Sequence, residues 1–328
     1  MEKNKQHSLQ TILFQNVQAS IPVHRSLVDE LSELLEISTD SVYRRLRNET
    51  MLSIDEVQII CNNYSISFDA ISNNEMQTVV CNHAALRNEK DLTNHLLYMN
   101  KELEFILSVP DSHITYAAID IPIFHHFQFQ ELSSFKIFYW LRSVINDADF
   151  NSKKYNPKLI SDELMIHYKK MFETYKTCNL TEIWTDSTIR SLIKQIEFFW
   201  QSGMFETRED ALLICDQAEQ EILLIQSMAD VPIQNQNEKQ YKLYFSEIEI
   251  GNNSILVKLG NQKRSYLSYN TLNLLVTSHQ GFCDEIEIWQ QNFIGKATLI
   301  SGASEKIRYQ FFRRLLDDIA ALKKRIEA

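Results

Sequence analysis

"LLEISTDSVYRRLRNET", residues 34–50, joins the end of an apolar run to a dense group of arginines. The apolar run stops at Ile37, and Ser38 follows as a residue type that favours the start of a helix. Three arginines then stand within residues 44–47. Upstream, apolar residues recur at helical spacing: Leu27, Val28, Leu31, Leu34 and Leu35. The sequence therefore predicts two helices, 27–36 and 39–48, joined by a very short turn.

The neighbouring segments complete a small helical bundle. An apolar stripe predicts a first helix over residues 8–20, which a proline ends. Ser53 with Glu56 three residues later forms a capping-box pattern ahead of "IDEVQIICNNY". Residues 65–71 predict a short final helix, and the polar stretch 72–80 is expected to be a linker. We expect residues 1–75 to form one domain.

Two helices joined by so short a turn are typical of a helix-turn-helix, whose second helix can lie in the DNA major groove. Val42 and Leu46 stand four apart and are expected to face the bundle. Arginines can pair with phosphate or, bidentately, with guanine. Ser26 and the free amides that begin the preceding helix can hold a phosphate. The polar residues left facing outward or sideways are Thr39, Asp40, Ser41, Tyr43, Arg44 and Arg47.

Residues 24–71 resemble the DNA-binding domain of Cro/repressor-like (XRE-type) bacterial transcriptional regulators. The resemblance rests on "LVDELSELLEISTDSVYRRLRNETMLSIDEVQIICNNYSISFDAI", taken in order, and above all on the pattern "STDSxYRRxRxET" found in large regulators. It implies a DNA-binding repressor or activator that is commonly a dimer on a palindromic site. Glu36 departs from the family, which often has Gly near this turn, and Asn48-Glu49 replaces the frequent Asn-Gly.

The resemblance also implies roles by position. The residues expected to read bases are Thr39, Asp40, Ser41, Tyr43 and Arg44. The residues expected to contact phosphate are Ser26, Arg45, Arg47 and Asn48, with Ser38 of the turn counted in the same interface.

Composition limits the other possibilities. The chain has 328 residues, of which 44% are hydrophobic, and a formal net charge of −10. That charge argues against nucleic-acid binding by the whole surface, but not by one basic face. Residues 1–70 carry six Lys and Arg against ten Asp and Glu, so a plain acidic bundle is the alternative. No apolar run is long enough for a membrane span, and five widely spaced cysteines suit a reducing compartment, so we expect a cytoplasmic protein.

The rest of the chain predicts two further domains and a mainly α fold. Residues 76–235 are expected to form a helical sensor or dimerisation domain, and residues 236–328 a small α+β domain. Expected helices in the first are 80–110, much of 124–145, 161–176, 186–202 and 207–228, around a short β-rich segment at 113–120. Expected in the second are a hairpin of 241–250 with 254–260, a helix-like segment 271–279, a strand within 282–294 and a final helix from Ser304.

Nothing in the sequence predicts an enzyme, a cofactor or a metal site. His125 and His126 are adjacent and therefore point in different directions, which makes them a poor ligand pair even with Asp120 and Glu131 nearby. The aromatic residues of 124–140 form core or line a pocket for an apolar or planar effector: Phe124, Phe127, Phe129, Phe135, Phe138, Tyr139 and Trp140.

These observations favour a bacterial transcriptional regulator that binds double-stranded DNA. A single DNA-binding domain of this size gains little affinity for DNA, so we expect a homodimer. We also expect a small-molecule or protein effector to act through residues 76–328. Two alternatives remain: a scaffold whose helical bundle docks a protein partner, and an enzyme of unrecognised type within residues 76–328.

Overall fold

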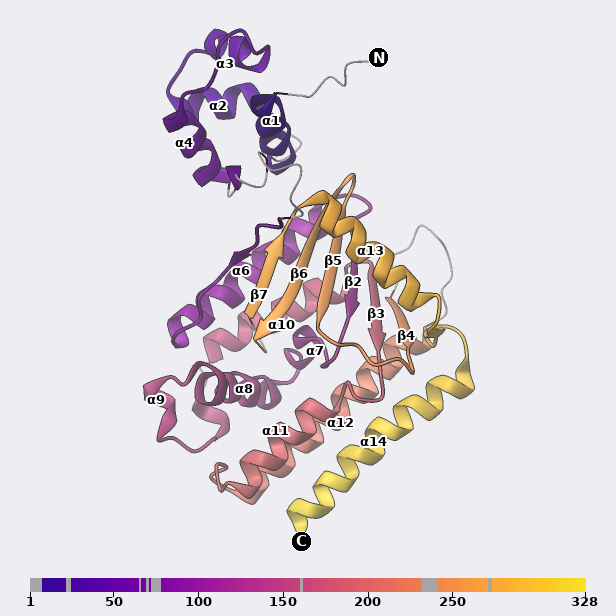
Figure 1. Ribbon diagram of the computed structural model, residues 1–328. Coiled ribbons are helices and arrows are strands. Elements are labelled where there is room, and N and C mark those ends of the chain that lie inside the picture. Colours follow the sequence, from indigo (N-terminus) through magenta and orange to yellow (C-terminus); the bar gives the residue numbers. More distant parts are fainter. Residues whose placement is uncertain are drawn as a thin grey trace. The chain divides into compact units, whose positions relative to one another are not determined.

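The computed structural model divides into two compact units, Met1–Asn82 and His83–Ala328 (Figure 1). It describes residues 8–21, 25–64, 66–68, 71, 78–159, 162–231, 241–270 and 273–328. Each unit is considered by itself.

The first unit is a helical bundle. Its helices are α1 (Leu9–Ser20), α2 (Leu27–Leu35), α3 (Thr39–Leu46) and α4 (Ile54–Tyr64). Each of the four contributes side chains to one apolar core, whose buried members are Leu13, Phe14, Val17, Ile21, Leu31, Val42, Ile60 and Ile71. The predicted helices at 8–20, 27–36 and 39–48 are confirmed to within two residues at each end. Phe68 and Ile71 are helical, as the predicted short helix at 65–71 requires, whereas residues 65, 69, 70 and 72–77 of that helix and of the predicted linker at 72–80 lie outside the described residues.

The predicted helix starts follow from side-chain caps. The Ser38 hydroxyl accepts a hydrogen bond from the amide of Ser41 at 3.3 Å, which caps α3. The Ser53 amide donates to the Glu56 carboxylate at 2.7 Å, and the Glu56 amide donates back to the Ser53 hydroxyl at 3.2 Å. This reciprocal pair is the predicted capping box, and it satisfies two backbone donors at the start of α4.

The second unit contains an eight-stranded sheet in the order β1-β7-β6-β5-β2-β3-β4-β8. Its middle strands β2, β3 and β4 are parallel, and β5 to β7 continue it as antiparallel strands. The strands are β1 (Asn82–His83), β2 (His113–Ala117), β3 (Leu180–Trp184), β4 (Tyr241–Phe245), β5 (Ser254–Leu259), β6 (Gln262–Asn270), β7 (Asn273–Thr277) and β8 (Thr298–Leu299).

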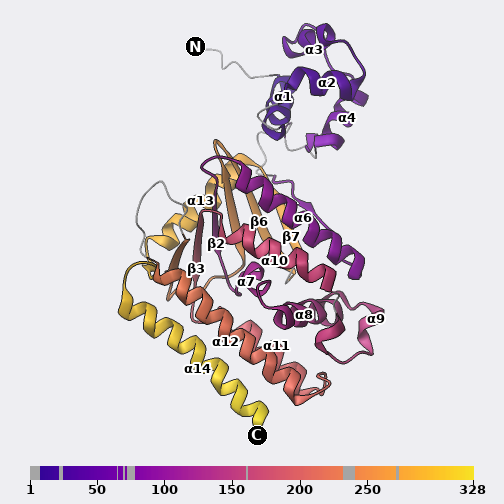
Figure 2. The same cartoon turned by 180° about the vertical axis from the view of Figure 1, so that it is seen from behind.

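Helices cover both faces of this sheet. Helices α6 and α10 lie on one face, and α13 lies on the opposite face (Figures 1 and 2). Helices α12 and α14 run side by side and share the main core with α6, α8, α10 and α11. The longer helices are α6 (Glu89–Ser108), α8 (Gln130–Tyr139), α10 (Asp162–Lys176), α11 (Arg190–Gln201), α12 (Arg208–Asp230), α13 (Gln280–Ile294) and α14 (Glu305–Glu327). The short ones are α7 (Ile123–His126), a π-helical turn η1 (Trp140–Ile145), α9 (Ala148–Asn151) and the 3₁₀ turn η2 (Pro157–Leu159).

The sheet joins the ranges 76–235 and 236–328, which the sequence predicted as separate domains. Strands β2 and β3 come from the first range, and β4 pairs with β3 across the expected boundary. The prediction of a nearly all-helical middle region overlooked β3, although β2 lies where a β-rich segment was expected. Every residue of β3 is buried, because it lies in the middle of a covered sheet. Such a strand lacks the alternation that reveals a half-exposed one.

Three predictions in the last third were wrong. The predicted hairpin of 241–250 with 254–260 does not form, because β4 pairs with β3 and β8, whereas β5 pairs with β2 and β6. The hairpin instead joins β5 to β6 through Gly260, whose φ of +61° suits a tight turn. The helix-like segment 271–279 contains β7, and the strand expected within 282–294 is α13.

Other expectations hold. Helix α12 begins with the predicted Thr207 cap and a capping box completed by Asp210. The final helix starts directly after Ser304, as predicted. The helix expected over 80–110 is confirmed only from Glu89 to Ser108, where Asn88 caps α6. Among the described residues, every helix is too short or too polar to span a bilayer.

Candidate nucleic-acid interface

Helix α3 has one face in the core and one in solvent. Val42 is 1% exposed and packs with the partly buried Leu46, as their spacing predicted. On the outer side Tyr43 is 48% exposed, and Arg44 beside it is exposed as well. Thr39 and Asp40 at the start of the helix are also exposed. The side chains expected to read bases therefore project from the bundle, except for the half-buried Ser41.

The turn that precedes α3 is held by backbone and side-chain hydrogen bonds. Glu36 ends α2 in the left-handed region, with φ at +53°. The Ile37 amide donates to the Ser32 carbonyl at 3.2 Å, and the Ser32 hydroxyl donates to the Ile37 carbonyl at 2.6 Å. Glu36 thus occupies a left-handed conformation in which glycine is the usual residue.

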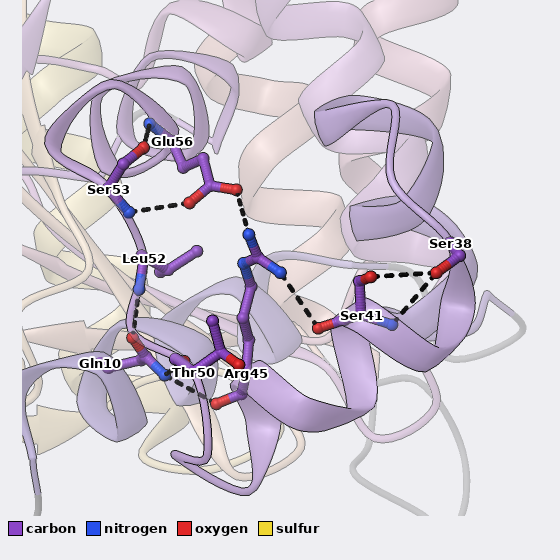
Figure 3. Close-up of polar contacts among 8 residues, drawn as sticks. All are labelled: Gln10, Ser38, Ser41, Arg45, Thr50, Leu52, Ser53 and Glu56. Atoms are coloured by element: carbon purple, nitrogen blue, oxygen red, sulfur yellow. Dashed lines mark hydrogen bonds and ion pairs between the residues drawn. The ribbon is translucent and has the colours of Figure 1, made fainter.

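The Arg45 side chain is mostly buried and turns toward α4. Its Nη2 donates to Glu56 Oε1 at 2.6 Å, and its Nη1 donates to the Ser41 carbonyl at 3.2 Å (Figure 3). The Arg45 and Glu56 side chains are only 15% and 18% exposed. The sequence prediction gave Arg45 a phosphate contact. Its guanidinium instead ties α3 to α4, so we leave it out of the proposed interface.

Gln10 fixes the chain that follows α3. Its side-chain amide donates to the carbonyls of Arg45 and Thr50 at 2.7 and 3.0 Å, and its carbonyl accepts from the Leu52 amide at 2.7 Å (Figure 3). Gln10 is 9% exposed, so all three bonds are largely shielded from water. Helix α1 therefore holds the link between α3 and α4, a role that sequence patterning did not reveal.

Asn48 and Arg47 also have partners within the unit. Asn48 has φ at +58°, and its side chain bonds to Ser8 and Thr11 of the α1 start at 2.8 and 2.9 Å. Its amide therefore supports the fold, and we leave it out of the proposed interface. The Arg47 guanidinium makes a bidentate pair with Glu49 at 2.7 and 3.1 Å, with both side chains about half exposed.

The remaining predicted residues lie at helix starts. Ser26 is exposed and caps α2 by backbone position only, since its hydroxyl makes no hydrogen bond to that helix. The hydroxyls of Ser38 and Ser41 lie 3.0 Å apart. Each of these helix starts offers backbone N–H groups and a hydroxyl to an anion, although acidic Asp29 and Glu30 stand in the first turn of α2.

The pKa shifts follow these pairings. Burial would raise the pKa of Glu56, but hydrogen bonds from the Ser53 amide and the Arg45 guanidinium lower it below its ordinary value. The hydrogen bond from Arg47 lowers the pKa of Glu49. Both carboxylates are therefore negatively charged at neutral pH. Of the three clustered arginines, Arg44 alone has no ion-pair partner among the residues that the structure describes.

In the second unit the side chains of the two adjacent histidines bond to different glutamates. His125 Nε2 lies 2.9 Å from Glu182 Oε1, and His126 Nδ1 lies 2.7 Å from Glu221 Oε1. The four side chains are at most 2% exposed. Burial would raise the pKa of Glu182, but the charge of His125 and three hydrogen bonds lower it. No group of three or more His, Cys, Asp and Glu side chains arranged for a metal occurs in the described part of the chain.

Comparison of the chain with protein-family models, with curated proteins and with solved structures finds no match in any of the three.

We predict that Arg45→Ala and Arg44→Ala differ sharply in their effect on stability. Removing Arg45 leaves the mostly buried Glu56 carboxylate without its cation, which should lower the free energy of unfolding of the first unit by about 1–3 kcal/mol. Removing exposed Arg44 should change it by about 0.5 kcal/mol or less. Both changes in the free energy of unfolding can be measured by urea unfolding, with hydrogen exchange in peptides from residues 39–64 as the probe. Equal effects would contradict the inward position of Arg45.

A pH dependence follows from Glu56. Because its pKa is lower in the folded state, ionised Glu56 stabilises the bundle above the ordinary value of 4.5, and this contribution is lost as pH falls through the folded pKa. The stability difference between the wild type and Glu56→Gln should therefore be constant near neutrality and shrink below about pH 4.5. Urea titrations over that pH range measure it. In an Arg45→Ala background the dependence should weaken, and an unchanged dependence would exclude the ion pair as its cause.

Proposed function

We propose that the first unit binds double-stranded DNA with α3 in the major groove, as part of a bacterial transcriptional regulator. The observation that carries the proposal is the outer face of α3. Tyr43 and Arg44 project there from a helix whose position is fixed on three sides by hydrogen bonds and core contacts. Neither side chain makes a hydrogen bond or ion pair within the described residues, so both are available to a partner.

The chemistry of this face suits base edges. Arg44 is suited to a bidentate contact with guanine O6 and N7. Asp40 can accept a hydrogen bond from the amino group of cytosine, and Thr39 can donate, accept or contact a thymine methyl. Tyr43, which is half exposed, offers a hydroxyl and an apolar ring. In this proposal Ser26, Ser38 and Ser41 contact phosphates through helix starts.

Charge sets the expected affinity and assembly. The chain carries a net charge of −10, and two of the three clustered arginines are already paired with glutamate. One copy of the unit therefore neutralises few phosphates, and non-specific binding should be weak. Two copies held on one duplex gain the affinity that a single copy lacks. We therefore propose a homodimer on a palindromic site, with residues 83–328 supplying dimerisation or effector binding in the cytoplasm.

One observation favours the alternative of a protein-docking scaffold. Met51 and Ile54, in and after the link from α3 to α4, are 65% and 86% exposed. Apolar side chains at this exposure suit a protein surface better than a phosphate backbone. Salt distinguishes the two proposals, because DNA binding weakens steeply as salt rises and apolar docking does not.

The test begins with selection of bound duplexes from random DNA by the purified full chain. On the selected site, Arg44→Ala should cost about 1–3 kcal/mol of binding in a gel-shift titration, because one bidentate base contact is lost. Arg313→Ala is the matched control, because its side chain is 61% exposed on α14 in the other unit. Failure to select any duplex, or equal binding by Arg44→Ala and the wild type, would contradict the proposal.

Glu49→Gln should strengthen DNA binding. The substitution removes the carboxylate that holds Arg47 and leaves the arginine free to pair with phosphate. One more neutralised phosphate should steepen the slope of log K against log salt by about 0.9. Gel-shift titrations at several salt concentrations measure this slope. A Glu49→Gln slope equal to that of the wild type would show that Arg47 lies away from the duplex.

A further inference from the structure

A small cavity in the second unit is lined by several charged and polar side chains, and one of them, the Trp140 indole, has no hydrogen-bond acceptor among the described residues. Its volume is about 50 Å³, and it lies between the segment after β2, the helix pair α8–η1 and strands β5 to β7. A water needs roughly 10–15 Å³ by this measure, so the cavity admits a group of a few non-hydrogen atoms. Its charged and polar lining includes Asp120, His126, Lys136, Trp140 and Asn253.

Lys136 is the least expected of these residues, because it is 4% exposed and has no carboxylate partner in the described residues. Its Nζ donates one hydrogen bond, to Gln195 Oε1 at 2.8 Å, and lies 5.4 Å from the centre of the Trp140 ring. An ammonium has three N–H donors, so two remain for another acceptor. Burial lowers the pKa of Lys136 to about 8, with Asp120 and Glu221 opposing the shift, so the amine is mostly protonated at neutral pH.

Trp140 supplies a second unused donor. It is 3% exposed, and its indole Nε1 has no acceptor among the described residues. Lys136 and Trp140 stand four apart where α8 passes into the π-helical turn η1, so both side chains reach the cavity from one helical segment. Turns of this kind are frequent at functional sites. A buried donor without an acceptor costs free energy, which a bound anion would recover.

Asp120 provides the opposite charge. It follows β2 by three residues, is half buried, and makes no hydrogen bond or ion pair in the described part of the chain. The crevice at the carboxyl end of a parallel strand is a common place for ligands in sheets of this kind. The residues that line the cavity therefore include a carboxylate, an ammonium group and an indole N–H, together with apolar Met99, Ile121 and Leu274.

We propose that this cavity binds the head group of a small α-amino acid. The ligand carboxylate would accept from Lys136 Nζ and Trp140 Nε1, and its ammonium group would donate to Asp120. A simple anion would be repelled by Asp120, and a simple cation by Lys136. An apolar ligand would leave the lysine and the indole N–H unpaired. A zwitterion alone satisfies both charges within so small a volume. This proposal does not depend on DNA binding by the first unit.

Calorimetric titration of the full chain tests the proposal with glycine, alanine and serine as probes. Acetate and methylammonium, which carry the two halves of the head group, are the comparison ligands. At least one amino acid should bind about tenfold or more tightly than either half, since each added charge pair contributes to one complex. Absence of binding by all three amino acids, or acetate binding as tightly as they do, would overturn the proposal.

Variants identify the site. Lys136→Met and Asp120→Asn should each weaken amino-acid binding about tenfold or more, and Trp140→Phe should weaken it several-fold. Lys194→Met, on the exposed side of α11, is the matched control and should bind normally. Asp120→Asn breaks no hydrogen bond or ion pair among the described residues, and Lys136→Met removes a charge that is costly to bury. Thermal unfolding should therefore show that both variants are folded. Folded variants that bind as the wild type does would place the ligand elsewhere.

Discussion

The ion pair between Arg45 and Glu56 is the contact on which the first unit depends. Its two members come from the last turn of α3 and the first turn of α4, and the same carboxylate also closes the capping box with Ser53. One side chain thereby sets where α4 begins and how α3 lies against it. Gln10 secures the intervening link from the side of α1. These contacts orient the exposed face of α3, because Arg45 is held against α4 and the adjacent Arg44 is thereby directed to solvent.

The bundle was predictable because its signals are local. The helix starts are marked by hydrogen bonds between residues three apart, which involve Ser38, Ser53 and Glu56. The spacing of Val42 and Leu46 indicates which side of α3 is buried. The roles of Arg45 and Asn48 were not predictable in this way. Their partners lie eleven and more than thirty residues away, at Glu56 and Thr11, and composition does not distinguish an arginine in an ion pair from one in solvent. The DNA contacts themselves stay a prediction.

The second unit was harder to predict because its sheet is built from distant segments. Strand β3 lies buried between β2 and β4, so its sequence has no alternating pattern. Conversely, "DEIEI" in α13 alternates as a strand would, yet it belongs to a helix of 15 residues. Pairing order carries no local signal either, which is why β4 and β5 were expected to form a hairpin. The partners of His125 and His126 are Glu182 in β3 and Glu221 in α12. These glutamates are far away in the sequence, so no local pattern predicted the two pairs.

The hydrogen bond from Lys136 to Gln195 has a consequence beyond the cavity. A lysine ammonium can only donate, so it holds the Gln195 side chain with its oxygen toward α8 and its nitrogen toward Ser191, whose hydroxyl it reaches at 3.0 Å. Any event that draws the ammonium away frees this amide to rotate. The Gln195 amide and its hydrogen bond to Ser191, in the first turn of α11, therefore depend on the position of the Lys136 ammonium, although no residue of α11 is among those that line the cavity.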